Sequence, residues 1–483
     1  MPEVVIVGAG IGGLATALLL GRQGREVVVC ERDPAQVPAA PEQMWAEWKR
    51  PGIPQAPLGH TFLPGFRMLL TERAPDVAER LYAAGAPLLD YARDMPGGER
   101  RPEDAELLAI MCRRAVLEGI LRQTVAAEPT VAIRTGCDVT GLVAEPSPMP
   151  GVPRVTGVRT RDGRAIAAGT VVVAGGRLVP VPRWLEAIGA HAPAEFSEGC
   201  GYVTFTRFFR IHRRPGEDHR VSARLAVEGD PGYMSYELFG ADASTFCVEL
   251  SPPAWDHDLR GLRHEAVHMA AARTLPESED WLDPGRATPI GPVAAMGQER
   301  NVLRHFVVDG RPVALGLHVI GDARCQLDSL YAWGSGVALA SAVTLVDLLA
   351  AHPGDHEAQA LAFEERLGGE IRGRHELSLA RDRAAARRYR GRPEWDDPDT
   401  GIGLVESTVV PAAEEDAEVF RAVMRADMQL DPVGALAHNT PVIDRARARK
   451  AARAQPPAST PAPGPAREHL LELIAQAGAR QVE

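Results

Sequence analysis

A glycine-rich segment near the start of the chain could bind a phosphate. Residues 8–13 read Gly-Ala-Gly-Ile-Gly-Gly, which satisfies the pattern G-x-G-x-x-G through Gly8, Gly10 and Gly13. In this pattern the first glycine permits a tight turn, the second lets the backbone approach a pyrophosphate, and the third lets helix and strand pack closely. N–H groups at the start of the next helix bind the phosphate. The segment therefore predicts a dinucleotide site, with Ile11 and Gly12 beside the phosphates.

An acidic residue follows at the spacing that dinucleotide binding requires. Glu31 ends the next apolar run, and a carboxylate about 20 residues beyond the glycines accepts hydrogen bonds from ribose hydroxyls. We assign its neighbour Arg32 to the same site. The glycine pattern and the acid do not by themselves distinguish FAD from NAD.

The elements that must position these residues form a βαβ unit. Residues 4–7 (VVIV) predict a buried parallel strand, residues 11–23 an apolar helix and residues 26–30 a second buried strand. Three further elements follow: a helix over 113–126, a hairpin of 155–159 with 164–168, and a short buried strand over 170–174.

The pattern changes after residue 198. Runs rich in β-branched and aromatic residues over 198–250 predict a mostly antiparallel second sheet, which we interpret as a substrate domain. A parallel-type strand at 313–320 and a long Ala/Val/Leu helix over 334–352 return to the first pattern, so the first domain is expected to be discontinuous. The tail is predicted to be helical over 355–390, loop-like over 391–415, helical over 416–453, a Pro-rich linker over 455–467 and a short helix over 469–476.

The fold class predicted is α/β, with a Rossmann-like dinucleotide-binding domain, a mostly antiparallel substrate domain and a C-terminal helical region. The predicted bounds are 1–180 for the first part of the dinucleotide-binding domain with some substrate-domain insertions, 181–290 for the substrate domain, 291–352 for the second part, 353–454 for the helical region, and 455–483 for the linker and terminal helix.

Composition excludes some classes of function. The net charge of −11 and pI near 5.8 argue against binding to a nucleic-acid backbone, which relies on clustered positive charge. Six scattered cysteines form no C-x-x-C pair, which fits a reducing cytoplasm. The N-terminus lacks a basic n-region, so no secretory signal is expected. We expected no apolar stretch long enough to span a membrane, and the sequence gives no indication of oligomeric state.

Three further segments resemble a known family. Arg114-Ala-Val-Leu-Glu118-Gly-Ile-Leu121 is similar to the R-x-x-L-E-x-x-L helix of the FAD monooxygenases that are like para-hydroxybenzoate hydroxylase. Gly321-Asp322-Ala323 looks like their "GD" element, and the run from Tyr331 through Gly334, Ser335 and Gly336 resembles their flavin-ring loop and helix.

A closer likeness is to the polyether epoxidase branch of that family. It rests on three segments and covers roughly residues 3–350: Gly52-Ile-Pro-Gln55, Pro182-Arg-Trp-Leu-Glu-Ala-Ile-Gly and Gly201-Tyr-Val-Thr-Phe-Thr-Arg.

The resemblance implies FAD as the cofactor. Asp322 would bind the ribityl chain, and Arg114 would lie near the diphosphate and ribityl region. The backbone amides of Gly334, Ser335 and Gly336 would face the pyrimidine edge of the flavin. This placement agrees with physical chemistry, because N–H groups at a helix N-terminus stabilise the negative charge of a reduced flavin.

By the same resemblance, NADPH or NADH would reduce the flavin, O2 would form a C4a-hydroperoxyflavin, and the oxygen would go to an aromatic or polyene small molecule. A shielded, largely apolar pocket suits this chemistry, and alternation in the second sheet suggests Tyr202, Phe205 and Tyr236 as its lining. His60 and Tyr331 are candidate proton-transfer residues by position.

The chain departs from the family pattern at several positions. Residues 173–179 (VAGGRLV) lack the family's aspartate and serine, Ser329 replaces a proline, and Pro57-Leu58 replaces an arginine-histidine pair. Because that aspartate helps the family handle FAD and NAD(P)H, two alternatives stay open. One is an FAD-dependent dehydrogenase or oxidase on the same fold, and the other is a flavin-fold partner protein without catalysis.

Two other motifs carry less weight. His264-Glu265-Ala-Val-His268 matches H-E-x-x-H, which can bind zinc, but no third ligand stands at a recognisable spacing, so no metal is assigned. Trp45 and Trp48 resemble half of a flavin-halogenase motif that lacks its isoleucine-proline and its paired lysine, so halogenation is disfavoured. The expected partners are a small-molecule substrate and O2.

Overall fold

A parallel five-stranded sheet forms the centre of the molecule. The computed structural model describes residues 2–212, 226–452 and 464–479. The sheet has the order β21-β10-β1-β2-β6, and every neighbouring pair is parallel. Its strands are β1 (Val4–Val7), β2 (Val27–Glu31), β6 (Val131–Thr135), β10 (Thr170–Val173) and β21 (Leu317–Val319). Because β21 comes from far along the chain, the first domain is discontinuous, as predicted.

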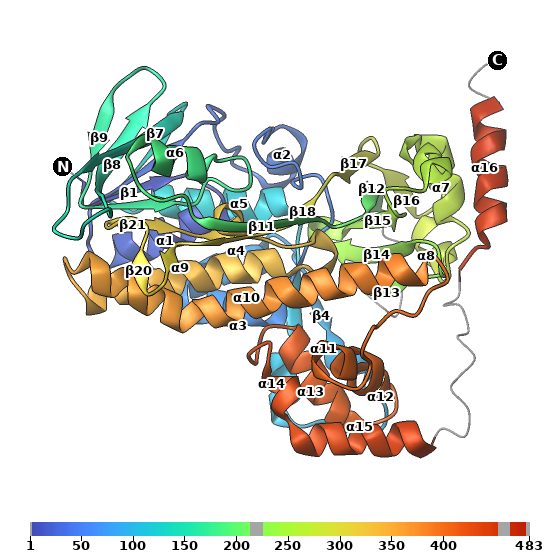
Figure 1. Cartoon of the computed structure of the whole chain (residues 1–483). Helices are drawn as coiled ribbons and strands as arrows, with labels where there is room; N and C mark the ends of the chain where they lie inside the picture. The colour runs from blue at the N-terminus through green and yellow to red at the C-terminus, as the bar shows by residue number, and fades with distance from the viewer. Residues whose placement is uncertain (1, 213–225, 453–463, 480–483) are drawn as a thin grey trace.

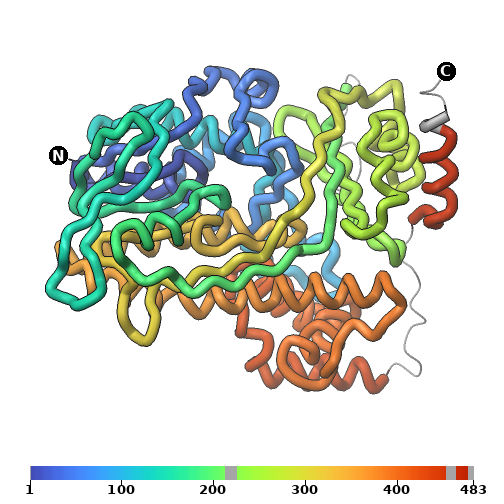
Figure 2. Tube along the Cα trace, turned by 45° about the horizontal axis from the view of Figure 1, so that its top comes forward, coloured from blue at the N-terminus to red at the C-terminus, as the bar shows by residue number. Residues whose placement is uncertain are grey.

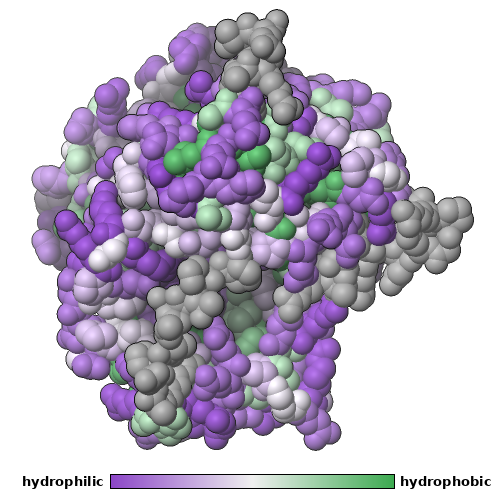
Figure 3. Space-filling model, turned by 90° about the vertical axis from the view of Figure 1, so that its right-hand side faces the viewer, coloured by the Kyte–Doolittle hydropathy of each residue, from purple (hydrophilic) through white to green (hydrophobic). Residues whose placement is uncertain are grey.

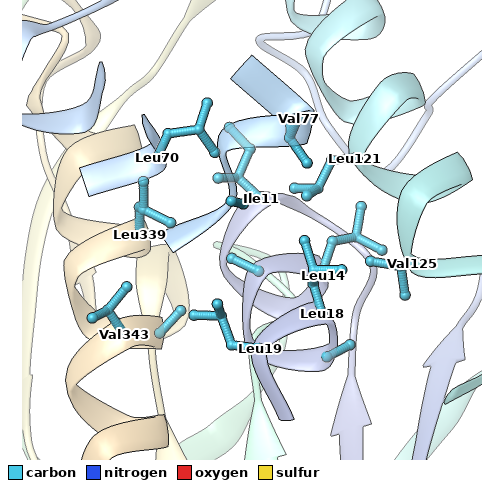
Figure 4. Close-up of a cluster of buried hydrophobic side chains, with 14 of the residues drawn as sticks. Ile11, Leu14, Leu18, Leu19, Leu70, Val77, Leu121, Val125, Leu339 and Val343 are labelled. Carbon is cyan, nitrogen blue, oxygen red and sulfur yellow. The ribbon is translucent and has the colours of Figure 1, made fainter. Parts of the chain in front are cut away.

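Three helices cover one face of this sheet: α1 (Ile11–Arg22), α5 (Arg114–Ala126) and α9 (Trp333–Ala351). Figure 4 shows Leu14 and Leu18 of α1 between Leu121 of α5 and Leu339 of α9. Leu14 and Leu18 are almost fully buried, and burying one leucine side chain contributes about 1.5–3 kcal/mol. This packing fixes the N-termini of α1 and α9 relative to the strand ends.

An antiparallel three-stranded meander covers the other face, together with α6 (Val181–Ala187). The meander consists of β7 (Val139–Glu145), β8 (Arg154–Thr160) and β9 (Ala165–Ala167). Val5 and Val171 of the parallel sheet share a buried cluster with Val158 of the meander. Strand β1 is therefore buried on both faces, which explains why its sequence is uniformly apolar.

A second, antiparallel sheet lies beside the first domain (Figure 1, right). Its order is β13-β14-β15-β12-β16, with β17 also pairing with β12. Its strands are β12 (Val203–Ile211), β13 (Ala226–Gly229), β14 (Ser235–Ala241), β15 (Thr245–Ser251), β16 (Ala287–Pro289) and β17 (Ala294–Gly297). One face packs on α7 (Glu265–Ala272), α8 (Ser278–Leu282) and α16 (Arg467–Ala479).

Smaller elements connect these layers. Two three-stranded sheets are β3 (Thr61–Phe62) with β5 (Leu108–Met111) and β4 (Leu88–Asp90), and β11 (Ala194–Gly199) with β18 (Arg300–His305) and β22 (Cys325–Gln326). The remaining pair is β19 (Val307–Val308) with β20 (Arg311–Pro312), and the remaining helices of this part are α2 (Pro41–Ala46), α3 (Pro64–Arg73) and α4 (Pro75–Ala83).

A helical region ends the chain. The long helix α10 (His356–Arg388) runs beneath both sheets, and a compact group of helices follows it (Figure 2). The group comprises α11 (Gly401–Leu404), a π-helical turn (Val405–Val409), α12 (Val410–Ala412), α13 (Ala417–Asp427), α14 (Ala435–His438) and α15 (Thr440–Ala452). The prediction of a loop throughout 391–415 is wrong from Gly401 on, because Val405, Val409 and Ala412 form a buried apolar stripe. Residues 455–463 of the predicted linker lie outside the described residues.

One described helix, α9, is long and apolar enough to cross a membrane by length and composition. Most of this helix is buried inside the molecule, as in the core helix of a globular protein. The sequence predicted this helix over 334–352, but the expectation that no apolar stretch is long enough to span a membrane is wrong for it by length and composition. The surface over α16 and α7 is mainly polar, with apolar residues in small separate groups (Figure 3).

Candidate cofactor and active site

A cavity of about 460 Å³ opens at the carboxyl ends of the parallel strands. Ligands bind at this edge in open α/β sheets, and the volume is in the range of small-molecule sites, about 300–1,000 Å³. Its walls come from six segments. They are the glycine turn, the ends of β2 and β10, the loop before β3, the segment from β21 to the start of α9, and one face of the antiparallel sheet. Each contributes some of its residues, within 8–12, 30–33, 174–180, 50–61, 320–335 and 237–249 respectively.

The glycine turn has the geometry that its sequence pattern requires. Gly8 has φ +101°, and a Cβ there would lie 2.6 Å from Gly175 Cα. A Cβ on Gly13 would lie 2.1 Å from the Gly8 oxygen, so only glycine permits this contact between helix and turn. A Cβ on Gly10 would meet no protein atom within 4 Å, because Gly10 faces the cavity. No side chain caps α1, so its first N–H groups are available to a phosphate.

Glu31 lies at the end of β2 in the cavity wall and is buried. Its Oε2 accepts from the Ala9 N–H at 2.8 Å, and its Oε1 accepts from the Asp33 N–H at 2.9 Å. The carboxylate therefore ties β2 to the glycine turn and faces the position predicted for a ribose. Arg32 also lines the cavity but is exposed.

Arg50 is a cavity residue that the sequence analysis missed. Its guanidinium is buried, lies 3.0 Å from Glu118 Oε2, and stacks on the Trp48 ring at 4.5 Å. It is also 3.6 Å from both Glu31 and Asp33. The one sequence feature that could have pointed to Arg50 is its place directly before the Pro-Gly-Ile-Pro-Gln segment. Its acidic partners Glu31, Asp33 and Glu118 come from three separate segments, so spacing in the sequence could not predict these contacts.

Arg114 and His60 contact each other across the cavity wall. Arg114 donates from Nε to Glu118 Oε1 at 2.8 Å, and its Nη1 lies 3.4 Å from His60 Nε2. His60 Nδ1 lies 3.1 Å from the Leu58 oxygen. Burial, and then the charge of Arg114, lower the pKa of His60 to about 3. His60 is therefore neutral near pH 7, and its Nε2 accepts from Arg114 while Nδ1–H donates to Leu58, so both nitrogens are engaged.

The end of the cavity next to the start of α9 carries a charged network. Asp322 lines the wall 3.6 Å from Arg177, and Arg177 lies 3.1 Å from Glu299. Ser329 donates to Glu299 Oε2 at 2.6 Å. Arg177 belongs to the segment that departs from the family pattern. The structure thus places a cation beside Asp322, at the position assigned to the ribityl chain.

The start of α9 is only partly in the cavity. Gly334 and Ser335 line it, whereas Gly336 faces away, and a Cβ there would lie 1.8 Å from Gln429 Oε1. The Cβ direction does not test the assignment of the Gly336 backbone amide to the cofactor, which stays a prediction. The 100° rotation per residue of a helix turns Gly336 away from the cavity and toward Gln429, just after the end of α13.

Tyr331 does not line the cavity either. Its hydroxyl donates to Asp382 Oδ1 of α10 at 2.8 Å, and burial together with Asp382 raises the pKa of the phenol. A phenol held in this way is poorly placed to transfer a proton to a ligand. Tyr331 acts instead as a contact between the flavin loop and α10.

The predicted substrate residues do not line the cavity. Phe205 and Tyr236 are on the other face of the antiparallel sheet, nearly fully buried in its core, and Tyr202 precedes β12 and packs edge-on against Tyr389. The side chains of alternate residues point to opposite faces of a strand. The cavity is lined instead by Thr204, Glu237, Phe239 and Glu249. For Phe205 and Tyr236 the correction is a shift by one residue along the strand, to Thr204 and Glu237.

Two neighbouring glutamates of the antiparallel sheet line the cavity. Glu237 and Glu249 are paired across β14 and β15. Glu249 accepts from the Gly59 N–H at 2.8 Å and from Thr206 Oγ1 at 2.6 Å. Burial, and then the neighbouring carboxylate, raise the pKa of Glu237 well above its usual value, and burial also raises that of Glu249. The substrate end of the cavity is therefore more polar than the apolar pocket we predicted.

The H-E-x-x-H motif does not form a metal site. His264 precedes α7, and His268 is fully buried with Nε2 3.2 Å from the Phe205 oxygen. Burial lowers the pKa of His268 to about 4. Among the described residues that line the cavity there is no lysine; Lys49 and Lys450 contact Ala46 and Thr408 instead.

Comparison with known proteins agrees with this geometry. A family model described as "FAD dependent oxidoreductase" matches residues 3–94. The protein has the fold of an FAD-dependent oxidoreductase. A search of curated proteins gives no match.

The fold assignment rests on solved structures over most of the chain. PqsL of Pseudomonas aeruginosa, a probable FAD-dependent monooxygenase, is 19% identical with a TM-score of 0.57, over 81% of this chain and 98% of that one. The flavin-dependent brominase Bmp2 is 15% identical with a TM-score of 0.58, over 89% and 100%. The myxobacterial chondrochloren halogenase CndH is 17% identical with a TM-score of 0.57, over 92% and 96%. The finer likeness to the polyether epoxidase branch stays a prediction.

Proposed function

We propose that the protein is an FAD-dependent monooxygenase, a hydroxylase or epoxidase, that acts on an aromatic or polyene small molecule in natural-product biosynthesis. The observation that carries this proposal is the single continuous cavity. It joins a dinucleotide end, at Gly10 and Glu31, to an end lined by Thr204, Glu237, Phe239 and Glu249 of the antiparallel sheet. A cofactor bound at the first end would reach a substrate held at the second.

The residues of the cavity fit FAD. Gly10 leaves open space for a pyrophosphate, the free N-terminus of α1 faces it, and Asp322 lies at the far end beside the start of α9. Bound FAD would supply the redox chemistry, accepting electrons from NADPH or NADH and activating O2. The protein's own residues then bind and orient: α9 directs its N-terminal amides at the cofactor, and Phe239 and Leu330 help exclude water.

The test is anaerobic reduction of the purified yellow protein. NADPH or NADH, with or without substrate candidates, is expected to bleach the visible flavin band, and O2 is expected to restore it. If neither nicotinamide reduces the flavin under any of these conditions, the monooxygenase proposal is wrong.

A dehydrogenase or oxidase is the second candidate, favoured by the segment that contains Arg177. That segment lacks the family's aspartate, and Arg177 forms ion pairs with Glu299 and Asp322 in the cavity wall. For this candidate, an organic substrate rather than a nicotinamide would bleach the flavin. A protein that takes up no FAD would instead indicate a partner protein without catalysis.

A further inference from the structure

Three potential metal ligands meet beneath the flavin loop. They are Cys200, directly after β11, Asp328, which begins the turn before α9, and Asp382, near the C-terminal end of α10. One ligand atom from each lies within 4.8 Å of the others, and the three residues are only 3%, 2% and 5% exposed. The sequence analysis assigned no metal because more than 50 residues separate each of these positions from the next, with no ligand pair at short spacing.

Neighbouring residues hold two of these side chains in place. Asp382 accepts from Asn301 Nδ2 at 2.6 Å and from the Tyr331 hydroxyl at 2.8 Å. Asp328 Oδ1 accepts from the Leu330 N–H at 2.9 Å. Outer hydrogen bonds of this kind orient the ligands of metal sites.

One oxygen in the group has no hydrogen-bond donor. Oδ2 of Asp328 is buried, no N–H or O–H group of the described residues donates to it, and the neighbouring side chain of the pair is another carboxyl group, that of Asp382. An unpartnered buried carboxylate oxygen is costly.

We propose that Cys200, Asp328 and Asp382 bind one divalent cation of the zinc class. Thiolate and carboxylates together suit Zn²⁺, whereas Mg²⁺ and Ca²⁺ prefer oxygen ligands alone. With Zn–S near 2.3 Å and Zn–O about 2.0–2.2 Å, the ligand atoms of a tetrahedral site lie about 3.3–3.8 Å apart, so the group must contract by about 1 Å. Binding releases the thiol proton to solvent, and a fourth position is left for a non-protein ligand.

The cation would join three segments of chain next to the cofactor. Asp328 is part of the cavity wall, Cys200 precedes the antiparallel sheet, and Asp382 belongs to the helix that underlies both sheets. This site lies outside the redox chemistry of the proposed function and does not depend on it.

The test uses Co²⁺ as a spectroscopic probe on the chelator-treated, FAD-loaded protein. One equivalent of Co²⁺ is expected to give the visible d–d bands of tetrahedral cobalt, at longer wavelength than the flavin. Zn²⁺ is expected to abolish these bands by displacement. Cys200→Ser should remove the sulfur-to-cobalt charge-transfer band, and Asp382→Asn should weaken binding at least tenfold. Cys112→Ser, at a buried cysteine away from the group, is the matched control and should leave the spectrum unchanged.

Two outcomes would overturn the proposal. One is the absence of stoichiometric Co²⁺ or Zn²⁺ binding to the folded wild-type protein. In that case a proton shared by Asp328 and Asp382 would explain how the two carboxyl groups can lie buried side by side. The other is a cobalt spectrum that is identical in wild type and Cys200→Ser. If Cys200→Ser does not fold, the Asp382→Asn titration and the charge-transfer band of the wild type decide.

Discussion

The glycines of the first turn serve two different purposes that substitution can separate. Gly13→Ala would force a Cβ to 2.1 Å from the Gly8 oxygen, so we expect a lower melting temperature and loss of FAD. Gly10→Ala meets no protein atom within 4 Å, so it should leave the melting temperature of the apoprotein unchanged yet weaken FAD binding at least tenfold. Thermal unfolding and FAD titration measure both effects.

The control for this pair is Gly141→Ala in β7, where a Cβ also meets nothing within 4 Å and which does not line the cavity. It should change neither quantity. Normal FAD affinity in Gly10→Ala would contradict the placement of the pyrophosphate.

His60 should make stability depend on pH. Its pKa in the folded protein is about 3, below the usual 6.5. As pH falls below 6.5, the unfolded chain therefore takes up a proton that the folded protein does not, and stability falls toward pH 3. At pH 5 the loss from this group amounts to up to about 2 kcal/mol.

The measurement compares His60→Gln with wild type by urea unfolding of the apoprotein at pH 7 and pH 5. The variant should lose less stability over this range. His257→Gln, at an exposed histidine, should behave as wild type. Equal losses in all three proteins would show that His60 is not held neutral.

Single residues were predictable where their role is local. The tasks of Gly8, Gly10 and Gly13 follow from a six-residue pattern, and the structure gives each the expected surroundings. Arg50 was not predictable, because its acid partners come from β2, the segment after it and α5.

At the scale of elements, the antiparallel sheet separates a structural face from a cavity face. Phe205→Ala removes a core side chain and should lower the free energy of unfolding by about 3–5 kcal/mol. Glu237→Gln keeps the shape of a cavity residue and should change stability by less than about 1 kcal/mol.

The two substitutions should affect substrate binding in the opposite order to their effects on stability. Once a substrate is found, its affinity for the FAD-loaded protein should change in Glu237→Gln and stay near wild type in Phe205→Ala. The reverse pattern would place the substrate on the α7 side of the sheet.

The same sheet shows the limit of prediction for elements. The sequence predicted strands over 198–250, of which 213–225 lie outside the described residues, but it did not predict which alternate set of side chains faces the cavity. A shift of one residue moves every side chain to the other face, and both sets here contain aromatic residues. Strand β1 carried no such ambiguity because it is buried on both sides.

At the scale of the whole molecule, the C-terminal helices support the cofactor end of the first domain. Arg381 of α10 lies 2.9 Å from both Glu406 and Asp427, and its guanidinium covers the Trp333 ring at 5.1 Å. Arg381→Met would leave two partly buried carboxylates without a cation, so we expect a loss of about 3 kcal/mol in the free energy of unfolding.

The control is Arg387→Met on the same helix, whose ion pair with Asp396 is at the surface and should contribute nothing measurable. Denaturant unfolding of both variants tests this. Equal midpoints would mean that the helical region is not coupled to α9. The sequence predicted helices around Arg381 and Asp427 but a loop around Glu406. It did not predict the attachment to α9, because an arginine and its acids are polar residues that surface helices also carry.

The return of the chain to the parallel sheet at β21 was predictable, because the apolar strand before Gly321-Asp322 repeats the pattern of β1. That return brings Asp322 to the same cavity as Gly10, and the proposed FAD site requires both residues in one cavity.

The most direct test is the cofactor content of the purified protein. The account predicts one FAD per chain, measured by the visible spectrum of the native protein and by release on heating, with loss of FAD in Gly10→Ala. A folded, colourless protein that takes up no added FAD would contradict it.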